Sequence, residues 1–368
     1  MNTNHRIIEL RRRLDEAGID VLIITNLLNV RYLTGFSGSA GSLIISSASY
    51  TSDSPGILFT DSRYMEQSEQ QVNESGSGAL VEIVIGNLSR QYEMARLFAA
   101  KSSKTAIEGD STSLTSFYAW TSALEKTIAV SEVKVETQRQ CKDDNEIDAI
   151  RRACQIADQA LEKVLPRLKD EPTEIEFAAE LEFHMRMLGA QGPSFDTIVA
   201  SGPHSAMPHA RPTDKRIIEG DPVVVDFGAI WDGYHSDCTR TYFLGSTPSR
   251  QFKRVYEAVE ASQLAGSATA LVGTAASKVD NACRDSLHQA GLDEFFTHST
   301  GHGVGLEVHE LPWIHKDNKS ALSVGDVMTV EPGVYLPGEM GVRIEDTIAI
   351  SQSGSERLTN IAKSPLIY

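Results

Sequence analysis

A predicted β-hairpin in the second half of the chain constrains the fold more than any other sequence feature. The apolar run Val223–Ala229 is followed by the segment His235–Arg240, and the dipeptide Asp232-Gly233 lies between them. This dipeptide favours a two-residue hairpin loop, because both of its positions tolerate positive φ. The sequence therefore predicts two antiparallel strands at this point.

Two aspartates fall on one face of this hairpin. Counting outward from the loop places Asp237 opposite Gly228, which shares a strand face with Asp226. The two carboxylates are then diagonal neighbours, with Cβ atoms about 7–8 Å apart or slightly less. They repel each other unless a positive charge lies between them, so a metal ion is one explanation. The other explanation is two ordinary surface aspartates beside a turn, although the valine run before Asp226 indicates a buried strand.

The composition is that of a globular protein able to bury a large core. The chain has 368 residues, of which 41% are hydrophobic and 23% are charged, and this length suggests two domains or one large domain. The 34 basic and 50 acidic residues give a formal charge of −16, which argues against nucleic acid and anionic membranes as partners. Four scattered cysteines without a C-x-x-C motif indicate free thiols. No apolar leader or 18-residue apolar run occurs, so we expect a cytoplasmic protein.

The pattern of elements changes near residues 136–143, where charged and polar residues cluster. Before this point, strands and helices alternate, which predicts an α/β domain over residues 1–137. After it, long helices and strand-like runs predict an α+β domain over residues 138–368, with an antiparallel sheet against the helices. The helices are expected at about Asp144–Leu165, Pro248–Ala270 and Ala275–Ala290, with a further helix opened by a capping box at Thr173 and Glu176.

A glycine-rich stretch supplies further histidines. The segment His298–Gly305 contains three glycines in five residues and continues to His309. This glycine density forbids a stable helix, so the stretch is not the two-histidine zinc helix of some metalloproteases. The glycines instead allow the backbone to approach another group closely.

A second, longer hairpin is predicted between Met328–Gly333 and Val342–Thr347. Folding this stretch symmetrically about Gly338 places Glu331 opposite Glu345. The second hairpin therefore repeats the arrangement of the first, with two carboxylates on one face.

The two hairpins and the glycine-rich stretch together form a candidate metal site. Asp226, Asp237, Glu331 and Glu345 contribute four negative charges, and His302 adds a neutral nitrogen. Such a cluster would be strongly destabilising if buried alone, and two divalent cations would balance it. Oxygen-rich ligation with one imidazole suits Mn²⁺, Co²⁺ or Fe²⁺ and also accommodates Zn²⁺.

In combination, these motifs resemble the pita-bread metallopeptidases, which include methionine aminopeptidase, aminopeptidase P and prolidase. Residues Tyr32–Gly41 and Phe59–Tyr64 also resemble the creatinase-like N-terminal domain of aminopeptidase P and prolidase. Methionine aminopeptidases lack that domain, so the resemblance favours the other two and covers nearly the whole chain. The C-terminal motifs are D-F-G-A, S-D-C-T-R-T, H-S-T-G-H-G-V-G-L-E-V-H-E, E-P-G and R-I-E-D.

The resemblance implies a role for each metal ligand. Asp226 holds one ion, and His302 with Glu331 holds the other. Asp237 and Glu345 bridge the two ions. Independently of the resemblance, the chemistry of a dinuclear site makes Glu331 a candidate general base or proton shuttle.

The same resemblance implies four residues beside the substrate. His209, His298 and His309 match histidines near the substrate, and His209 and His309 are expected to act in catalysis. Arg343 matches an arginine that orients the carboxylate ligands and borders the substrate. The role of His235 stays open, because it is expected either beside the site or exposed.

These features predict a dinuclear metal-dependent exopeptidase of the aminopeptidase P type, which hydrolyses the Xaa-Pro bond at the N-terminus of peptides. The alternative is an Xaa-Pro dipeptidase, or prolidase, for which Arg211 is either a candidate carboxylate-binding residue or a surface arginine. A metal-free pita-bread binding protein and a creatinase-type hydrolase are remote alternatives, because the ligand set is complete. We expect manganese as the metal, proline-containing peptides or dipeptides as substrates, and a homodimer, as the resemblance implies.

Overall fold

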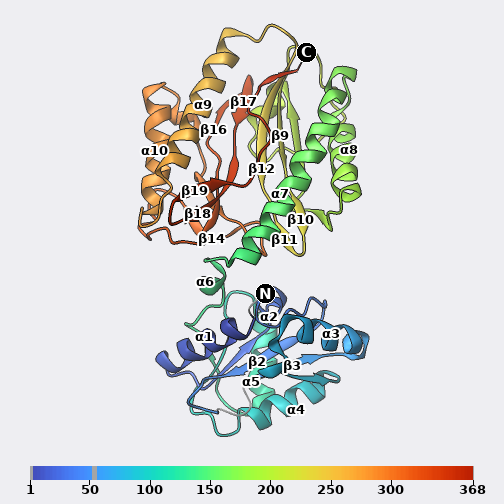
Figure 1. Ribbon diagram of the computed structural model, residues 1–368, viewed down its shortest axis with the longest axis vertical. Helices are drawn as coiled ribbons and strands as arrows, with labels where there is room; N and C mark the ends of the chain where they lie inside the picture. Colours follow the sequence, from blue (N-terminus) through green and yellow to red (C-terminus); the bar gives the residue numbers. More distant parts are fainter. Residues whose placement is uncertain (1–2, 52–55, 368) are drawn as a thin grey trace. The chain divides into compact units, whose positions relative to one another are not determined.

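The computed structural model describes residues 3–51 and 56–367, and the chain forms two compact units that meet in sequence at Arg139 and Gln140 (Figure 1). In the described part of the chain, none of the helices combines the length and the apolar character needed to cross a bilayer.

The first unit is a six-stranded mixed sheet with helices packed against it, ordered β4-β3-β2-β1-β5-β6. β1 is buried along its whole length, and it pairs with β2 in antiparallel and with β5 in parallel orientation. The core of this unit includes Ile23, Phe59 and Trp120. The helices are α1 (Thr3–Glu16), α2 (Leu27–Thr34), α3 (Met65–Ser75), α4 (Leu88–Phe98), α5 (Leu114–Leu124) and α6 (Glu136–Arg139). The strands are β1 (Val21–Ile24), β2 (Ser42–Ser46), β3 (Gly56–Thr60), β4 (Glu82–Ile85), β5 (Thr105–Ile107) and β6 (Ala129–Val130).

The helices of the second unit form two pairs on opposite sides of its strands (Figure 1). One pair packs into a core that contains Phe177 and Val225, and the other pair packs into a core that contains Phe252 and Met328. The pairs are α7 (Asp144–Val164) with α8 (Glu174–Met187), and α9 (Arg250–Thr269) with α10 (Ala276–Gln289). The predicted capping box is present, since Thr173 Oγ1 accepts from Glu176 N and the Glu176 carboxylate accepts from Thr173 N.

Between the helix pairs lie a four-stranded sheet, β20-β12-β9-β8, and a five-stranded sheet, β14-β13-β15-β18-β19. Two smaller ladders, β11-β10-β7 and β16-β17, extend the hairpins. The first strands are β7 (Gly192–Pro193), β8 (Ile198–Ser201), β9 (Pro222–Phe227), β10 (Ala229–Trp231), β11 (Tyr234–His235), β12 (Cys238–Leu244) and β13 (Gly301–Gly303). The others are β14 (Glu310–Ile314), β15 (Val327–Val330), β16 (Gly333–Leu336), β17 (Met340–Arg343), β18 (Asp346–Ser351), β19 (Gly354–Arg357) and β20 (Leu366–Ile367).

Candidate active site

The first predicted hairpin is present with the expected register. Asp232 and Gly233 have φ of 45° and 70°, and Trp231 pairs with Tyr234 across the turn. The same register continues in β9 and β12, where Asp226 pairs with Thr239. Asp237 therefore lies opposite Gly228, as the turn chemistry predicts.

The second hairpin also has the expected register. Val330 pairs with Asp346 in the β15–β18 ladder, and Gly333 pairs with Arg343 in the β16–β17 ladder. Glu331 and Glu345 fall between these two ladders and lie opposite each other. The two hairpins are joined at this point, because Glu345 N donates a hydrogen bond to Thr239 O at 3.1 Å.

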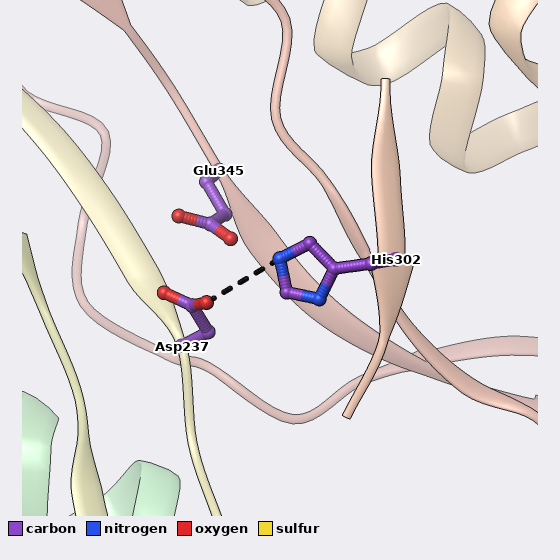
Figure 2. A group of neighbouring side chains, drawn as sticks. All are labelled: Asp237, His302 and Glu345. Atoms are coloured by element: carbon purple, nitrogen blue, oxygen red, sulfur yellow. Dashed lines mark ion pairs between the residues drawn. The ribbon is translucent and has the colours of Figure 1, made fainter. Parts of the chain in front are cut away.

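His302 lies at the centre of the short strand β13, between two glycines that neighbouring backbone approaches closely. A Cβ atom on Gly301 would lie 2.1 Å from Thr329 O, and one on Gly303 would lie 2.0 Å from Leu311 O. Only glycine permits this packing. The His302 side chain points toward Asp237 and Glu345 (Figure 2), and its Nε2 atom is 3.6 Å from Asp237 Oδ2.

All nine predicted site residues line one cavity of about 440 Å³ in the second unit. Apolar side chains complete its wall, notably Phe195 and Trp313, and Trp313 is 42% exposed. The nine residues are His209, Asp226, Asp237, His298, His302, His309, Glu331, Arg343 and Glu345. His235 does not line this cavity.

The cavity holds four carboxyl groups, and burial perturbs each of them. Burial raises the pKa of Asp237 and of Glu345 well above their ordinary values, and neighbouring carboxylates add to both shifts. Burial also raises the pKa of Asp226, although Arg343 opposes this shift. Burial alone would raise the pKa of Glu331 as well, but the hydrogen bond and charge of His302 lower it to about 2.

The donor set fits divalent metal ions. Asp226 Oδ1 and Glu345 Oε1 are buried oxygen atoms without a hydrogen-bond partner among the described residues, and such atoms are costly unless a cation satisfies them. One ligand atom from each of Asp237, His302 and Glu345 lies within 4.8 Å of the others. Two ligand atoms of one ion are at most about two bond lengths apart, and a metal–ligand bond is about 2.1 Å long. The separation within this group is close to that limit.

Arg343 links the carboxylate cluster to the surrounding structure and is only 3% exposed. Its Nη2 atom donates to Asp226 Oδ2 at 2.6 Å, and its Nε atom donates to Thr239 Oγ1 at 3.1 Å. Its Nη1 atom donates to Tyr335 Oη at 2.8 Å and to Pro208 O at 3.1 Å. Four of the five guanidinium N–H groups are therefore bonded to the protein.

The other histidines differ in their surroundings. His298 Nδ1 donates to Ser299 O at 2.8 Å, so its Nε2 atom accepts from the Tyr335 hydroxyl at 2.9 Å. Burial lowers the pKa of His298. The His309 ring lies 4.2 Å from that of His302 between centroids, and burial and the charge of His302 lower its pKa. His209 is exposed on the loop that follows β8.

Several residues that support the site were not predicted from the sequence. Thr239 donates to Glu345 Oε2 at 2.7 Å, and Thr329 donates to Glu331 Oε1 at 3.2 Å. Each threonine lies two residues from an acidic member of the cluster, so the two-residue period of a strand was a usable signal. The positions of Phe195 and Trp313 in the cavity wall could not be predicted from such a two-residue period.

Comparison with known proteins identifies the family. Residues 148–352 match metallopeptidase family M24, and residues 6–141 match the creatinase/prolidase N-terminal domain. The chain belongs to metallopeptidase family M24. It has a two-domain pita-bread fold with a creatinase-like N-terminal domain, so the expected family, fold class and enzyme class are confirmed. Membership implies divalent metal ions.

Proteins related to this M24 metallopeptidase, and solved structures similar to it, carry related names. The Xaa-Pro dipeptidase of Pyrococcus horikoshii is 36% identical over 361 residues, which cover 97% of each chain. The structure of an Xaa-Pro dipeptidase from Bacillus anthracis has a TM-score of 0.92 and 38% identity, with both chains covered completely. That of an X-Pro aminopeptidase from Thermotoga maritima has a TM-score of 0.86 and 35% identity, covering 96% of this chain and 100% of its own.

Proposed function

We propose that this M24 metallopeptidase is an Xaa-Pro aminopeptidase, which removes the first residue from peptides whose second residue is proline. The observation that carries this proposal is the convergence of four carboxyl groups and His302 on one cavity, which three further histidines also line. The names of similar proteins support the same substrate class, since they include Xaa-Pro dipeptidases and an X-Pro aminopeptidase.

We assign five residues to two divalent metal ions, with manganese as the favoured metal. Asp226 would hold one ion, His302 and Glu331 the other, and Asp237 and Glu345 both. The unpaired oxygens of Asp226 and Glu345 support this assignment. When bound, such ions polarise the substrate carbonyl and lower the pKa of water toward about 7.

The remaining residues handle protons and orient the substrate. Glu331 is the candidate general base or proton shuttle, and Thr329 Oγ1 holds one of its oxygens by a hydrogen bond of 3.2 Å. His309 and His209 line the cavity, and we assign them to hold the substrate or to give a proton to the leaving proline nitrogen. His298, fixed by Tyr335, would present a neutral ring to the substrate, and Arg343 orients Asp226.

The cations at the cavity favour the aminopeptidase over the dipeptidase. A dipeptidase gains from a fixed cation that binds the free carboxylate after proline. Two arginines line the cavity, and four of the five N–H donors of Arg343 are already bonded to the protein. The Arg211 side chain is 86% exposed and lies 3.6 Å from Asp196, which is exposed as well. We infer that the end of the cavity beside Arg211 is open to longer peptides.

An Xaa-Pro dipeptidase is the second candidate, favoured by the names of the relatives from Pyrococcus and Bacillus. The deciding experiment compares kcat/KM for Ala-Pro and Ala-Pro-Ala with one metal. We expect the tripeptide to be preferred. A preference of tenfold or more for the dipeptide, about 1.4 kcal/mol of transition-state discrimination, would favour the dipeptidase.

We further propose a homodimer in a reducing, cytoplasmic environment, with domain limits at residues 1–137 and 138–368. The four cysteines are all free thiols, which suits such a compartment. Light scattering on the purified protein tests the dimer, which a monomeric mass at micromolar concentration would contradict.

A further inference from the structure

The carboxylate of Glu174, in the first turn of α8, binds both ends of the loop 202–212. Glu174 is fully buried, and it accepts from Ser201 N at 2.8 Å and from Ser201 Oγ at 2.9 Å. It also accepts from Thr213 N at 3.1 Å and from Thr213 Oγ1 at 2.7 Å. His204 Nδ1 lies 2.9 Å and 3.0 Å from its two oxygens. One charged acceptor therefore closes this loop.

The backbone of the same helical turn adds to this anchor. Glu174 N donates to Lys215 O at 3.0 Å, and Ile175 N donates to Thr213 O at 3.1 Å. Amides in the first turn of a helix have no partner within the helix, so they are free to bind the loop. The positive end of the helix dipole also favours a carboxylate at this position.

The middle of the loop is fixed to the second catalytic hairpin. Gly341 N donates to Ser205 Oγ at 2.8 Å, and a Cβ atom on Gly341 would lie 2.0 Å from Ser205 O. Arg343 Nη1 donates to Pro208 O, directly before His209. The position of His209 at the cavity wall therefore depends on contacts at both ends and in the middle of the loop.

We propose that Glu174 is a positioning residue, which holds His209 at the wall of the cavity by tying both ends of the loop 202–212 to α8. This inference rests on the proposed function, in which His209 contacts the substrate. A buried carboxylate suits the task, because hydrogen bonds to a charged acceptor are stronger than those to a neutral one. A loop that is ordered before the substrate binds also avoids the entropic cost of ordering it during binding.

The variant Glu174→Gln tests this role, because it keeps the size of the side chain but turns an amide group toward hydrogen-bond donors. We expect kcat/KM for Ala-Pro-Ala to fall about tenfold to a hundredfold, since misplacing a catalytic group by about 1 Å can cost about 10²-fold. Metal content should stay at the wild-type level, because the proposed ligands lie on other elements. Glu176→Gln is the matched control, and wild-type kcat/KM is expected for it. Glu176 lies in the same turn but is exposed, and its carboxylate accepts from Thr173 N at the start of the helix.

A double-mutant cycle with His209→Ala separates positioning from general damage. If Glu174 acts through His209, Glu174→Gln should lower kcat/KM by less than about twofold in the His209→Ala background. Equal losses in both backgrounds would overturn the inference alone. Thr213→Val removes one donor to the carboxylate and should show the same non-additivity if the glutamine variant unfolds. Wild-type protein that cleaves no Xaa-Pro peptide would overturn the proposed function, and this inference with it.

Discussion

Replacing Glu345 with glutamine should change the stability of this metallopeptidase in opposite directions with and without metal. Ligand atoms of Glu345 and Asp237 lie within 4.8 Å of each other, and both residues are buried. Two carboxylates at that separation repel by about 3 kcal/mol at an effective dielectric constant of about 20. Burial raises the pKa of Glu345 well above its usual value, and the charge of Glu331 adds to this shift. The metal-free protein therefore relieves part of the repulsion by binding a proton, so this energy is an upper limit.

In the metal-free protein, Glu345→Gln removes this repulsion and keeps an oxygen that accepts from Thr239 Oγ1. We expect the unfolding temperature to rise by up to about 5–10 °C, since 1 kcal/mol corresponds to about 2–4 °C in a unit of this size. With metal at about 100 times Kd, the wild-type protein gains about 2.7 kcal/mol for each site. The variant loses that gain and becomes the less stable of the two.

Calorimetry at about pH 8, where carboxylates outside the cluster are ionised, measures both states on protein that is first dialysed against a chelator and then loaded with Mn²⁺. Elemental analysis of the same samples gives the metal content. Glu339→Gln is a matched control, because Glu339 lies at the exposed tip of the same hairpin. A Glu345→Gln protein that is destabilised in both states, or that keeps two bound ions, would refute the ligand assignment.

Three further predictions follow from the site and the core. His302→Ala should lower the metal content, whereas His309→Ala should lower kcat and leave the metal content unchanged; equal metal loss in elemental analysis would contradict this division. Arg211→Ala should change the ratio of kcat/KM for Ala-Pro and Ala-Pro-Ala by less than about twofold, and a selective loss of about tenfold on Ala-Pro would instead favour the dipeptidase. Burial raises the pKa of Asp158 from 3.8 to about 6, so its ionisation costs nothing below about pH 4 and up to about 3 kcal/mol above about pH 6. Asp158→Asn should therefore raise the unfolding temperature at about pH 8 but not at about pH 4 in calorimetry, and an equal shift at both pH values would contradict this assignment.

The relative positions of the four carboxyl groups could be predicted because short-range chemistry determines each hairpin register. Asp232 and Gly233 adopt the positive φ values that a two-residue loop requires. The two-residue period of a strand then carries that register outward to Asp226 and Asp237. The second hairpin behaves in the same way, so Glu331 lies opposite its expected partner.

The interruptions of the ladders could not be predicted in this way. Glu331 N donates to Thr300 O at 2.8 Å, and Glu345 N donates to Thr239 O at 3.1 Å. These amides leave their own ladders to bind residues that are distant in the chain, and no local pattern encodes such partners. Pro332 offers only a partial clue, because it lacks the amide hydrogen that a continuous ladder would use.

The way in which the loop 202–212 is anchored could not be predicted from the sequence either. The side-chain hydrogen bonds of Glu174 join it to residues 27 to 39 positions further along the chain. Local patterns identified the start of α8 from its capping box, but they gave Glu174 no role. The apolar wall formed by Phe195 and Trp313 likewise depends on tertiary packing, because the two residues lie on separate segments.

The most direct test of metal-dependent Xaa-Pro hydrolysis is the release of free alanine from Ala-Pro-Ala and from Ala-Ala-Ala. Both peptides are incubated with chelator-dialysed protein, before and after Mn²⁺ is added back. We predict no release without metal, and release from the proline peptide alone once metal is restored. Cleavage by the metal-free protein, or equal release from the two peptides, would contradict the proposed function.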